Sequence, residues 1–230
     1  MDKRAALAEI EAEMAADTAL PLTGAANLVF GEGVPDCRVM FIGEAPGANE
    51  DRLKRPFVGR GGRLLDDMIR GLGWKREEVY ITNIVKRRPP ENRDPLPAEI
   101  EAYAPYLARQ IAVIDPPLIV TLGRFSMNYF LPYAKMTRDH GRPLTIGGRA
   151  IYPVYHPAAA LRSTQMMNTL REDFKKIPDV LAGRIAAELP PAFDPHLPPA
   201  KAEPSKGARA GSRRASGGHA SETPEQTGLF

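Results

Sequence analysis

The stretch CRVMFIGEAPGANED, residues 37–51, joins a run of large apolar side chains to a turn-forming loop. Its first seven residues favour a β-strand, and the Gly and Pro that follow end that strand. Three further runs have the same character, namely EVYITNIV (78–85), LIVTLG (118–123) and AIYPVY (150–155). Each of the four runs predicts one strand.

Helical periodicity fills the intervals between these strands. It is clearest in residues 61–73 and 97–114, weaker in 124–131, and returns in 163–189 with an interruption near Pro178. Alternating strands and helices indicate the α/β class, in which helices cover both faces of a parallel sheet. We therefore expect a three-layer α/β/α domain built on a four-stranded parallel sheet.

Composition divides the chain into two parts. It has 230 residues, of which 43% are hydrophobic, enough for one substantial core. Residues 198–228 contain no large aliphatic or aromatic side chain, so that segment has little to bury. We expect residues 1–189 to form one domain and residues 190–230 to be a disordered tail.

The N-terminus and the cysteine content indicate the compartment. MDKRAALAEIEAEMAAD (1–17) predicts an amphipathic helix and not a secretory signal. No apolar run approaches the roughly 20 residues that a membrane helix requires. Cys37 is the only cysteine, which excludes an intrachain disulfide and a metal site built on several thiolates. These features predict a cytoplasmic protein with no membrane partner.

Polar residues stand at the expected carboxyl ends of the strands, where open parallel sheets bind ligands. Glu44 follows the first strand, Asn83 lies in the second, Arg124 follows the third and His156 the fourth. Taken singly, each has an ordinary structural explanation, and their convergence on one edge is what indicates a site. The loop after Gly43 lacks the sequence of a Walker phosphate loop or of a dinucleotide-binding loop.

Two nearby segments have both a structural and a functional interpretation. Phe57, in RPFVGRGGRLL (55–65), is either a lid on the core or a flat surface on which a planar ligand stacks. KRRPPENR (86–93) is either a solvated basic loop or a contact for an anionic partner.

Four blocks, in this order and spacing, resemble the uracil-DNA glycosylase superfamily, most closely its family 4. They are GEAPGANEDRLKRPFVGRGGRLLDDMI (43–69), VYITNIVKRRPPENRDP (79–95), IVTLG (119–123) and YHPAAALR (155–162). The resemblance extends from about residue 27 to 177. It implies the family fold, a four-stranded parallel sheet between helices, in agreement with the strand and helix pattern.

The resemblance implies excision of uracil from DNA by hydrolysis of its N-glycosidic bond, leaving an abasic site. The base must leave the stack because the bond is inaccessible inside the duplex. By similarity, Phe57 stacks on the flipped base and Asn83 reads its edge, since a carboxamide matches uracil O4 and N3–H. His156 then donates a hydrogen bond toward O2 as charge develops on the leaving base.

The catalytic carboxylate departs from the best-known branch of the superfamily, in which an aspartate stands at the position of Ala45. The resemblance therefore points to Glu44 and Glu50 jointly, with Asp51 as an alternative, to position water or to stabilise the sugar cation. Another branch blocks thymine with a tyrosine where this chain has Gly47. That residue does not explain thymine exclusion here.

Contacts to DNA are also implied by the resemblance. HPAAALR (156–162) is similar to the family's intercalation loop, with Leu161 as the wedge and Arg162 on a phosphate. The resemblance also implies that the basic segment at 86–93 contacts the DNA backbone through Arg87 and Arg88.

Typical family 4 proteins hold a four-iron, four-sulfur cluster on four cysteines. Asp17, Leu20, Arg87 and Tyr103 occupy those positions here, and none can ligate such a cluster. We expect a protein without that cofactor and without a bound metal, in which packing around Leu20 and Tyr103 replaces it. Cys37 lies elsewhere and is expected to pack as a small apolar residue.

A second interpretation is a protein that binds uracil-DNA or other lesions without turnover. Another branch of the superfamily becomes covalently joined to DNA through a histidine that residues 86–93 lack. Glu44, Asn83 and His156 favour a hydrolase. The sequence leaves open whether other deaminated bases are accepted and whether single or double strands are preferred.

QTGLF (226–230) matches the Q-x-x-L-F form of bacterial sliding-clamp-binding peptides. Gln226, Leu229 and Phe230 would fill pockets on the clamp, although short motifs also match by accident. A tether of this composition would keep a monomeric repair domain near bacterial DNA by raising its effective concentration.

Overall fold

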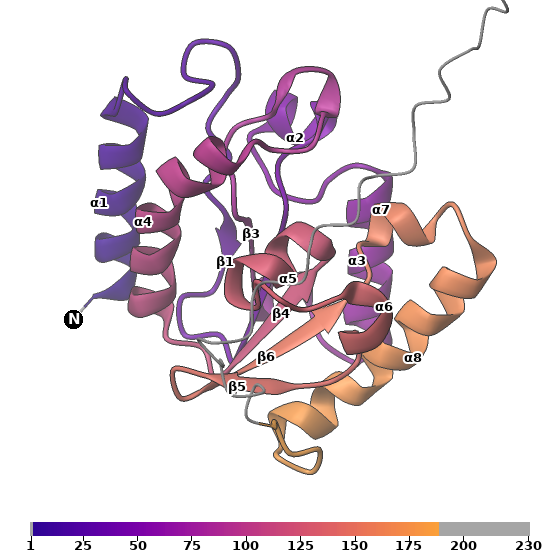
Figure 1. Ribbon diagram of the computed structural model, residues 1–230. Helices are drawn as coiled ribbons and strands as arrows, with labels where there is room; N and C mark the ends of the chain where they lie inside the picture. The colour runs from indigo at the N-terminus through magenta and orange to yellow at the C-terminus, as the bar shows by residue number, and fades with distance from the viewer. Residues whose placement is uncertain (1, 189–230) are drawn as a thin grey trace, which may run out of the picture. The chain divides into compact units, whose positions relative to one another are not determined.

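The computed structural model describes residues 2–188, and the expected tail at 190–230 lies outside them. Within the described residues the chain forms one six-stranded sheet in the order β1-β3-β2-β4-β6-β5 (Figure 1). The four central strands are parallel, and both edge strands are antiparallel to their neighbours. The strands are β1 (Glu32–Gly33), β2 (Val39–Gly43), β3 (Tyr80–Asn83), β4 (Leu118–Leu122), β5 (Leu144–Ile146) and β6 (Arg149–Val154).

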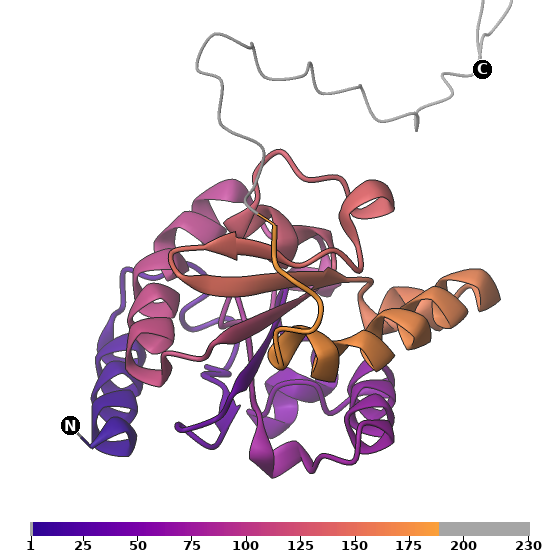
Figure 2. The same cartoon turned by 90° about the horizontal axis from the view of Figure 1, so that it is seen from below.

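Helices cover both faces of the sheet, as expected for a three-layer α/β/α domain (Figure 2). One face carries α1, α4 and α5, and the other carries α3 and α8. The described helices are α1 (Lys3–Ala16), α2 (Ala48–Leu53), α3 (Arg60–Gly71), α4 (Pro97–Ile114), α5 (Arg124–Phe130), α6 (Met136–Asp139), α7 (Pro157–Ala160) and α8 (Thr164–Leu181). Two 3₁₀ turns, η1 (Arg76–Glu78) and η2 (Pro90–Asn92), lie in connections.

The alternation of side chains along β2 divides the interior into two apolar layers. Met40 and Ile42 belong to the layer beneath α1 and α4, whereas Val39 and Phe41 belong to the layer beneath α3 and α8. Because both faces are covered, every residue of this strand is buried. This explains why the strand reads as a continuous apolar run.

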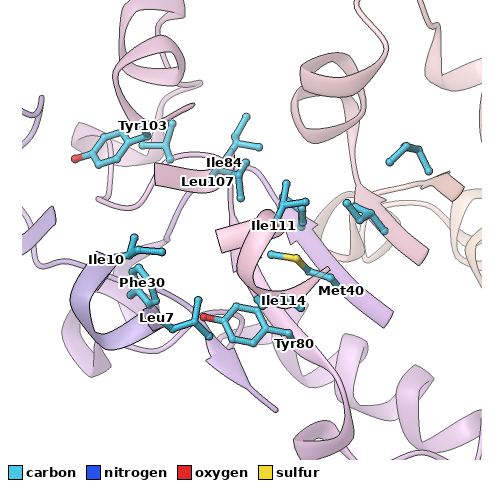
Figure 3. Close-up of a cluster of buried hydrophobic side chains, with 14 of the residues drawn as sticks. Leu7, Ile10, Phe30, Met40, Tyr80, Ile84, Tyr103, Leu107, Ile111 and Ile114 are labelled. Atoms are coloured by element: carbon cyan, nitrogen blue, oxygen red, sulfur yellow. The ribbon is translucent and has the colours of Figure 1, made fainter. Parts of the chain in front are cut away.

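Figure 3 shows the first of these layers. Its labelled side chains come from α1, α4, β2, β3 and the connecting segments: Leu7, Ile10, Phe30, Met40, Tyr80, Ile84, Tyr103, Leu107, Ile111 and Ile114. Cys37 is buried in the same layer, as expected for a small apolar residue. In the second layer Phe41 of β2 stacks on Phe174 of α8, with 5.9 Å between ring centroids.

The expectation of a four-stranded sheet is correct for the parallel core and misses the two edges. β1 has only two residues and β5 only three, too short to show a periodic pattern. The hairpin from β5 to β6 turns at Gly147 and Gly148, both with positive φ. A Gly-Gly pair between two β-prone segments is a hairpin signal that would have revealed β5.

The expected interruption of the last helix at Pro178 is wrong. Helix α8 continues through Pro178 to Leu181 and ends before Gly183, whose φ of +70° suits a left-handed cap. Residues after this cap are not helical up to Glu188, which pairs with Leu144 at the sheet edge.

The first residues of the basic segment at 86–93 are buried. Lys86 is inaccessible, and its Nζ lies 2.5 Å from Thr82 Oγ1, 2.5 Å from Gln110 Oε1 and 3.3 Å from the Phe30 carbonyl oxygen. Burial lowers the pKa of this amine well below its usual value. Lys86 therefore joins β3 to α4, and it is not part of a solvated loop.

None of the helices in residues 2–188 has the length and apolar character needed to cross a bilayer.

Candidate active site

A cleft of about 620 Å³ opens at the carboxyl ends of β2, β3 and β6. Its walls are the loop before α2, the turn that begins α3, the segment around η2, and α7. The volume falls within the roughly 300–1,000 Å³ typical of small-molecule sites. The predicted residues Glu44, Ala45, Phe57, Asn83 and His156 all line this cleft.

Gly43 ends β2 directly before the cleft residue Glu44 and lies against two side chains that line the cleft. A Cβ on this residue would lie 2.4 Å from Asn83 Oδ1 and 2.4 Å from the Phe57 ring. Non-bonded heavy atoms pack at about 3.5–4.0 Å. Any residue other than glycine at position 43 would therefore displace the Asn83 and Phe57 side chains from the end of β2.

The side chain of Phe57 lines the cleft, and the backbone of this residue is strained. Its φ is +50°, a left-handed conformation that bulky residues rarely adopt. The ring is only 6% exposed and lies 5.6 Å from the His156 ring, with 29° between the planes. This position, between Gly43 and the His156 ring, suits a surface on which a planar ligand stacks.

Asn83 contributes an unpaired amide group. The residue is 2% exposed, and its carboxamide makes no hydrogen bond to any residue in the described part of the chain. Buried polar groups almost always have a partner. One donor and one acceptor in one plane are therefore available to a ligand in the cleft.

His156 is held in one orientation at the start of α7. Its Nδ1 accepts a hydrogen bond from the Ala158 amide at 3.1 Å, and its Cβ packs against Gly123. Burial lowers the pKa of the imidazole to about 4, although Glu50 opposes this shift. The ring is thus neutral at pH 7, and because Nδ1 is an acceptor, the proton is on Nε2. His156 can donate a hydrogen bond without carrying charge.

Glu44 is a partly buried carboxyl with no hydrogen-bond partner in residues 2–188. Burial raises its pKa to about 7; the charge of Asp94 adds to this rise and that of Arg124 reduces it. Arg124 and Asp94 also form an ion pair at 3.3 Å. The carboxyl therefore titrates closer to neutral pH than an ordinary glutamate, and its ionised form can stabilise positive charge.

Glu50 and Asp51 are both engaged by backbone groups. Glu50 Oε1 accepts hydrogen bonds from Val58 N at 2.9 Å and Gly59 N at 2.7 Å. Its other oxygen would lie 2.9 Å from a Cβ on Gly47. Asp51 Oδ1 accepts from the Asn27 amide at 2.7 Å. Glu44 is therefore the carboxylate of the three that faces the cleft unengaged.

The site thus combines a stacking ring, an amide that reads a planar edge, a neutral donor and an ionisable carboxyl. This set suits the recognition of an uncharged heterocycle and the stabilisation of charge on both sides of a breaking bond. A model of the family described as the uracil DNA glycosylase superfamily matches residues 30–181.

The chain belongs to the uracil-DNA glycosylase superfamily.

Three relatives illustrate this membership. A type-4 uracil-DNA glycosylase of Sulfurisphaera tokodaii is 48% identical over 66% of this chain and 73% of the relative. A type-4 enzyme of Thermotoga maritima is 43% identical over 69% of this chain and 86% of the relative. A type-5 uracil-DNA glycosylase of Thermus thermophilus is 30% identical over 66% and 78%. The chain therefore spans most of each relative's length.

The structure argues against one predicted DNA contact. Arg87 is 5% exposed, and its Nη1 donates to the Tyr103 hydroxyl at 3.2 Å, so the guanidinium points into the protein. The run of basic residues does not reveal this orientation, because the direction of the Arg87 side chain depends on packing against α4. Arg88 is partly exposed, and its Nε donates to Asn92 Oδ1 at 2.7 Å.

The rim of the cleft carries the other expected DNA contacts. Leu161 follows α7 and is 38% exposed, one of the few large apolar side chains that project from the described surface. Arg162 is exposed and lines the cleft. Arg60, which the sequence pattern did not single out, also lines the cleft and has no charged partner within residues 2–188.

The four positions of the family's cluster cysteines do not fit an iron–sulfur group. Leu20 and Tyr103 are buried, and the Tyr103 hydroxyl donates to the Pro21 carbonyl oxygen at 2.6 Å. Asp17 instead accepts a hydrogen bond from the Tyr106 hydroxyl at 2.8 Å. No group of three or more candidate metal ligands occurs in the described part of the chain.

The segment around η2 was missed as part of the site. Asn92, Arg93 and Asp94 line the cleft, and Glu91 and Asn92 have positive φ. The sequence interpretation treated this segment as a basic loop, and its two prolines were the signal for a rigid turn. Asp94 acts on the site through its charge near Glu44.

Glu44 should titrate near pH 7, and neutralising Asp94 should lower its pKa. Asp94→Asn removes a negative charge that disfavours ionised Glu44, so the midpoint should move downward. Arg124→Gln removes a favourable positive charge, so the midpoint should move upward. Carboxyl ¹³C NMR of labelled glutamates measures both shifts. Asp179→Asn, on the distant surface of α8, is the control, and an equal shift there would contradict the assignment.

Proposed function

We propose that this protein is a uracil-DNA glycosylase, which hydrolyses the N-glycosidic bond of uracil in DNA. The observation that carries the proposal is the unpaired Asn83 carboxamide, which lies against the end of β2 at Gly43, in the same cleft as Phe57 and His156. Relatives named as type-4 uracil-DNA glycosylases, at 39–48% identity, support the same activity.

The geometry supports recognition of a base outside the helix. Phe57 is almost fully buried, so its ring is reached only by a group that enters the cleft. An N–H and a carbonyl on one edge of uracil match the amide of Asn83, whereas cytosine presents the opposite pattern. Extrusion of the base also explains why a deep cleft, and not a flat surface, carries these residues.

His156 and Glu44 then act on the two sides of the breaking bond. The Nε2–H of neutral His156 donates to the oxygen on which negative charge develops as the base departs. Ionised Glu44 stabilises the sugar, which becomes cationic in the transition state, or orients the attacking water. Electrons of the glycosidic bond leave with the uracil anion, which is then protonated, while water adds to the sugar carbon.

Glu50 supplies a reason for thymine exclusion that the sequence did not provide. Its second oxygen lies where a side chain on residue 47 would begin, 2.9 Å from a Cβ built on Gly47. The tyrosine of the other branch would begin at this same place. We propose that the fixed carboxylate of Glu50 occupies that space and disfavours the 5-methyl group.

Leu161, Arg60 and Arg162 form the proposed DNA-facing rim. An exposed apolar side chain at this place suits insertion into the gap that the base leaves. The guanidinium groups of Arg60 and Arg162, which have no ion-pair partner in residues 2–188, suit phosphate contacts, which fix the position of the protein without reading sequence.

We also propose that the activity requires no iron–sulfur cluster. The hydrogen-bond chain from Arg87 through Tyr103 to Pro21, together with buried Leu20, connects the segment after α1 to α4. These contacts give that segment direct attachment to the domain.

The test is uracil release from a labelled oligonucleotide by protein treated with a chelator. We expect abasic sites and free uracil in equal amounts, with no loss of rate on chelation. Glu44→Gln and Asn83→Ala should each lower the rate on the order of 100-fold, as removal of a transition-state partner does. Asn168→Ala, an exposed amide on α8 away from the cleft, is the matched control. Tight binding of uracil-DNA with no free uracil would favour the lesion-binding alternative.

We propose that QTGLF binds a bacterial sliding clamp. Gln226, Leu229 and Phe230 lie outside the described residues, and the motif alone supports this proposal. A weak peptide contact would raise the local concentration of the enzyme at replicating DNA.

Binding of the full chain to purified clamp tests this proposal. The double variant Leu229→Ala and Phe230→Ala should lose binding, because the apolar pair fills the pocket. Thr227→Ala, at a variable position of the motif, should bind like the unaltered chain. If neither the full chain nor a peptide of residues 221–230 binds clamp, the motif is accidental.

A further inference from the structure

Arg76 donates hydrogen bonds to the backbone at Phe57, although its side chain lies outside the cleft. Its Nη1 donates to the Phe57 carbonyl oxygen at 3.2 Å, and its Nη2 donates to the Pro56 carbonyl oxygen at 2.6 Å. The same guanidinium pairs with Glu32 at 2.7 Å and Asp66 at 2.5 Å. Every nitrogen of the guanidinium is thus engaged, and its side chain is only 14% exposed.

The amide N–H groups of the next two residues are held from another direction. Glu50 Oε1 accepts hydrogen bonds from the amides of Val58 and Gly59. A cation therefore fixes the carbonyl groups of residues 56 and 57, and an anion fixes the amide groups of residues 58 and 59. Charge-assisted hydrogen bonds of this kind are stronger than neutral ones.

The Phe57 backbone needs such restraint because its conformation is unfavourable. At a φ of +50°, a residue with a Cβ is strained relative to the ordinary regions. Strain of this kind persists only where surrounding contacts over-determine the conformation. Gly62 allows the close approach, because a Cβ there would lie 1.9 Å from the Phe57 carbonyl oxygen.

We propose that Arg76 is a positioning residue for base stacking: by holding the Pro56 and Phe57 carbonyls, it keeps the Phe57 ring facing the cleft. Arg76 does not line the cleft. Its action is therefore transmitted entirely through Phe57. This inference rests on the proposed function, since stacking matters only if a base enters the cleft.

Arg55 provides a matched comparison within the same ion cluster. It pairs with Glu32 through Nε at 2.7 Å and Nη2 at 3.0 Å, but its side chain donates to neither carbonyl of the Phe57 turn. Its side chain is 58% exposed, so the loss of this pair should have little effect. Arg55→Gln thus weakens the ion cluster and spares the turn.

The experiment compares Arg76→Gln, Arg76→Lys and Arg55→Gln in single-turnover uracil release. Arg76→Gln should reduce the rate on the order of 100-fold, because small displacements of a positioned group have effects of this size. Arg76→Lys keeps the charge for Glu32 and Asp66 but cannot bridge both carbonyls, so it should fold and remain slower. Arg55→Gln should match the unaltered protein, and circular dichroism verifies that each variant is folded.

A double-mutant cycle with Phe57→Ala separates positioning from general destabilisation. If Arg76 acts through Phe57, Arg76→Gln should cause almost no further loss in the Phe57→Ala background. Multiplication of the two losses would overturn the inference, and so would full activity of folded Arg76→Lys and Arg76→Gln. Absence of uracil release by the unaltered protein would instead refute the proposed function. The cycle would then be run on binding of uracil-containing DNA, where multiplying losses would equally overturn the inference.

Discussion

The absence of a side chain at Gly43 is the constraint on which the site depends. This residue ends β2, the strand between β3 and β4, and a Cβ here would collide with both Asn83 and Phe57. The Asn83 amide and the Phe57 ring, for which we propose base reading and base stacking, can therefore both lie against the end of β2 only because residue 43 has no side chain. Parallel strands bring Asn83 directly beside Gly43, since the two residues are partners in the ladder between β2 and β3.

Burial shifts the pKa values of two ionisable groups at the cleft in opposite directions. It raises the pKa of Glu44 to about 7 and lowers that of His156 to about 4. Between these values His156 is neutral and can donate without presenting a positive charge to an uncharged base. Above about 7 the carboxyl is mostly ionised, and it can then stabilise a cationic sugar. One cleft thereby supplies a neutral donor on one side and an anion on the other.

The four parallel strands and the residues at their ends were predictable because buried parallel strands are apolar throughout and their carboxyl ends meet. This rule alone singled out Asn83 and His156 as candidates, whereas the choice between a lid on the core and a stacking surface for Phe57 rested on the family resemblance. The direction of Arg87 and the reach of Arg76 were not predictable. Both depend on long-range packing, against Tyr103 in one case and the Pro56 carbonyl in the other, which local sequence does not encode.

Single-turnover uracil release by Gly43→Ala, compared with Gly71→Ala, tests the central claim most directly. Gly71 lies at the end of α3, where a Cβ would meet no atom within 4 Å. We predict that Gly71→Ala retains full activity, whereas Gly43→Ala folds but loses activity on the order of 100-fold, because the added methyl displaces the ring and the amide. Equal activity of the two folded variants would contradict the claim that the site requires a residue without a side chain at position 43.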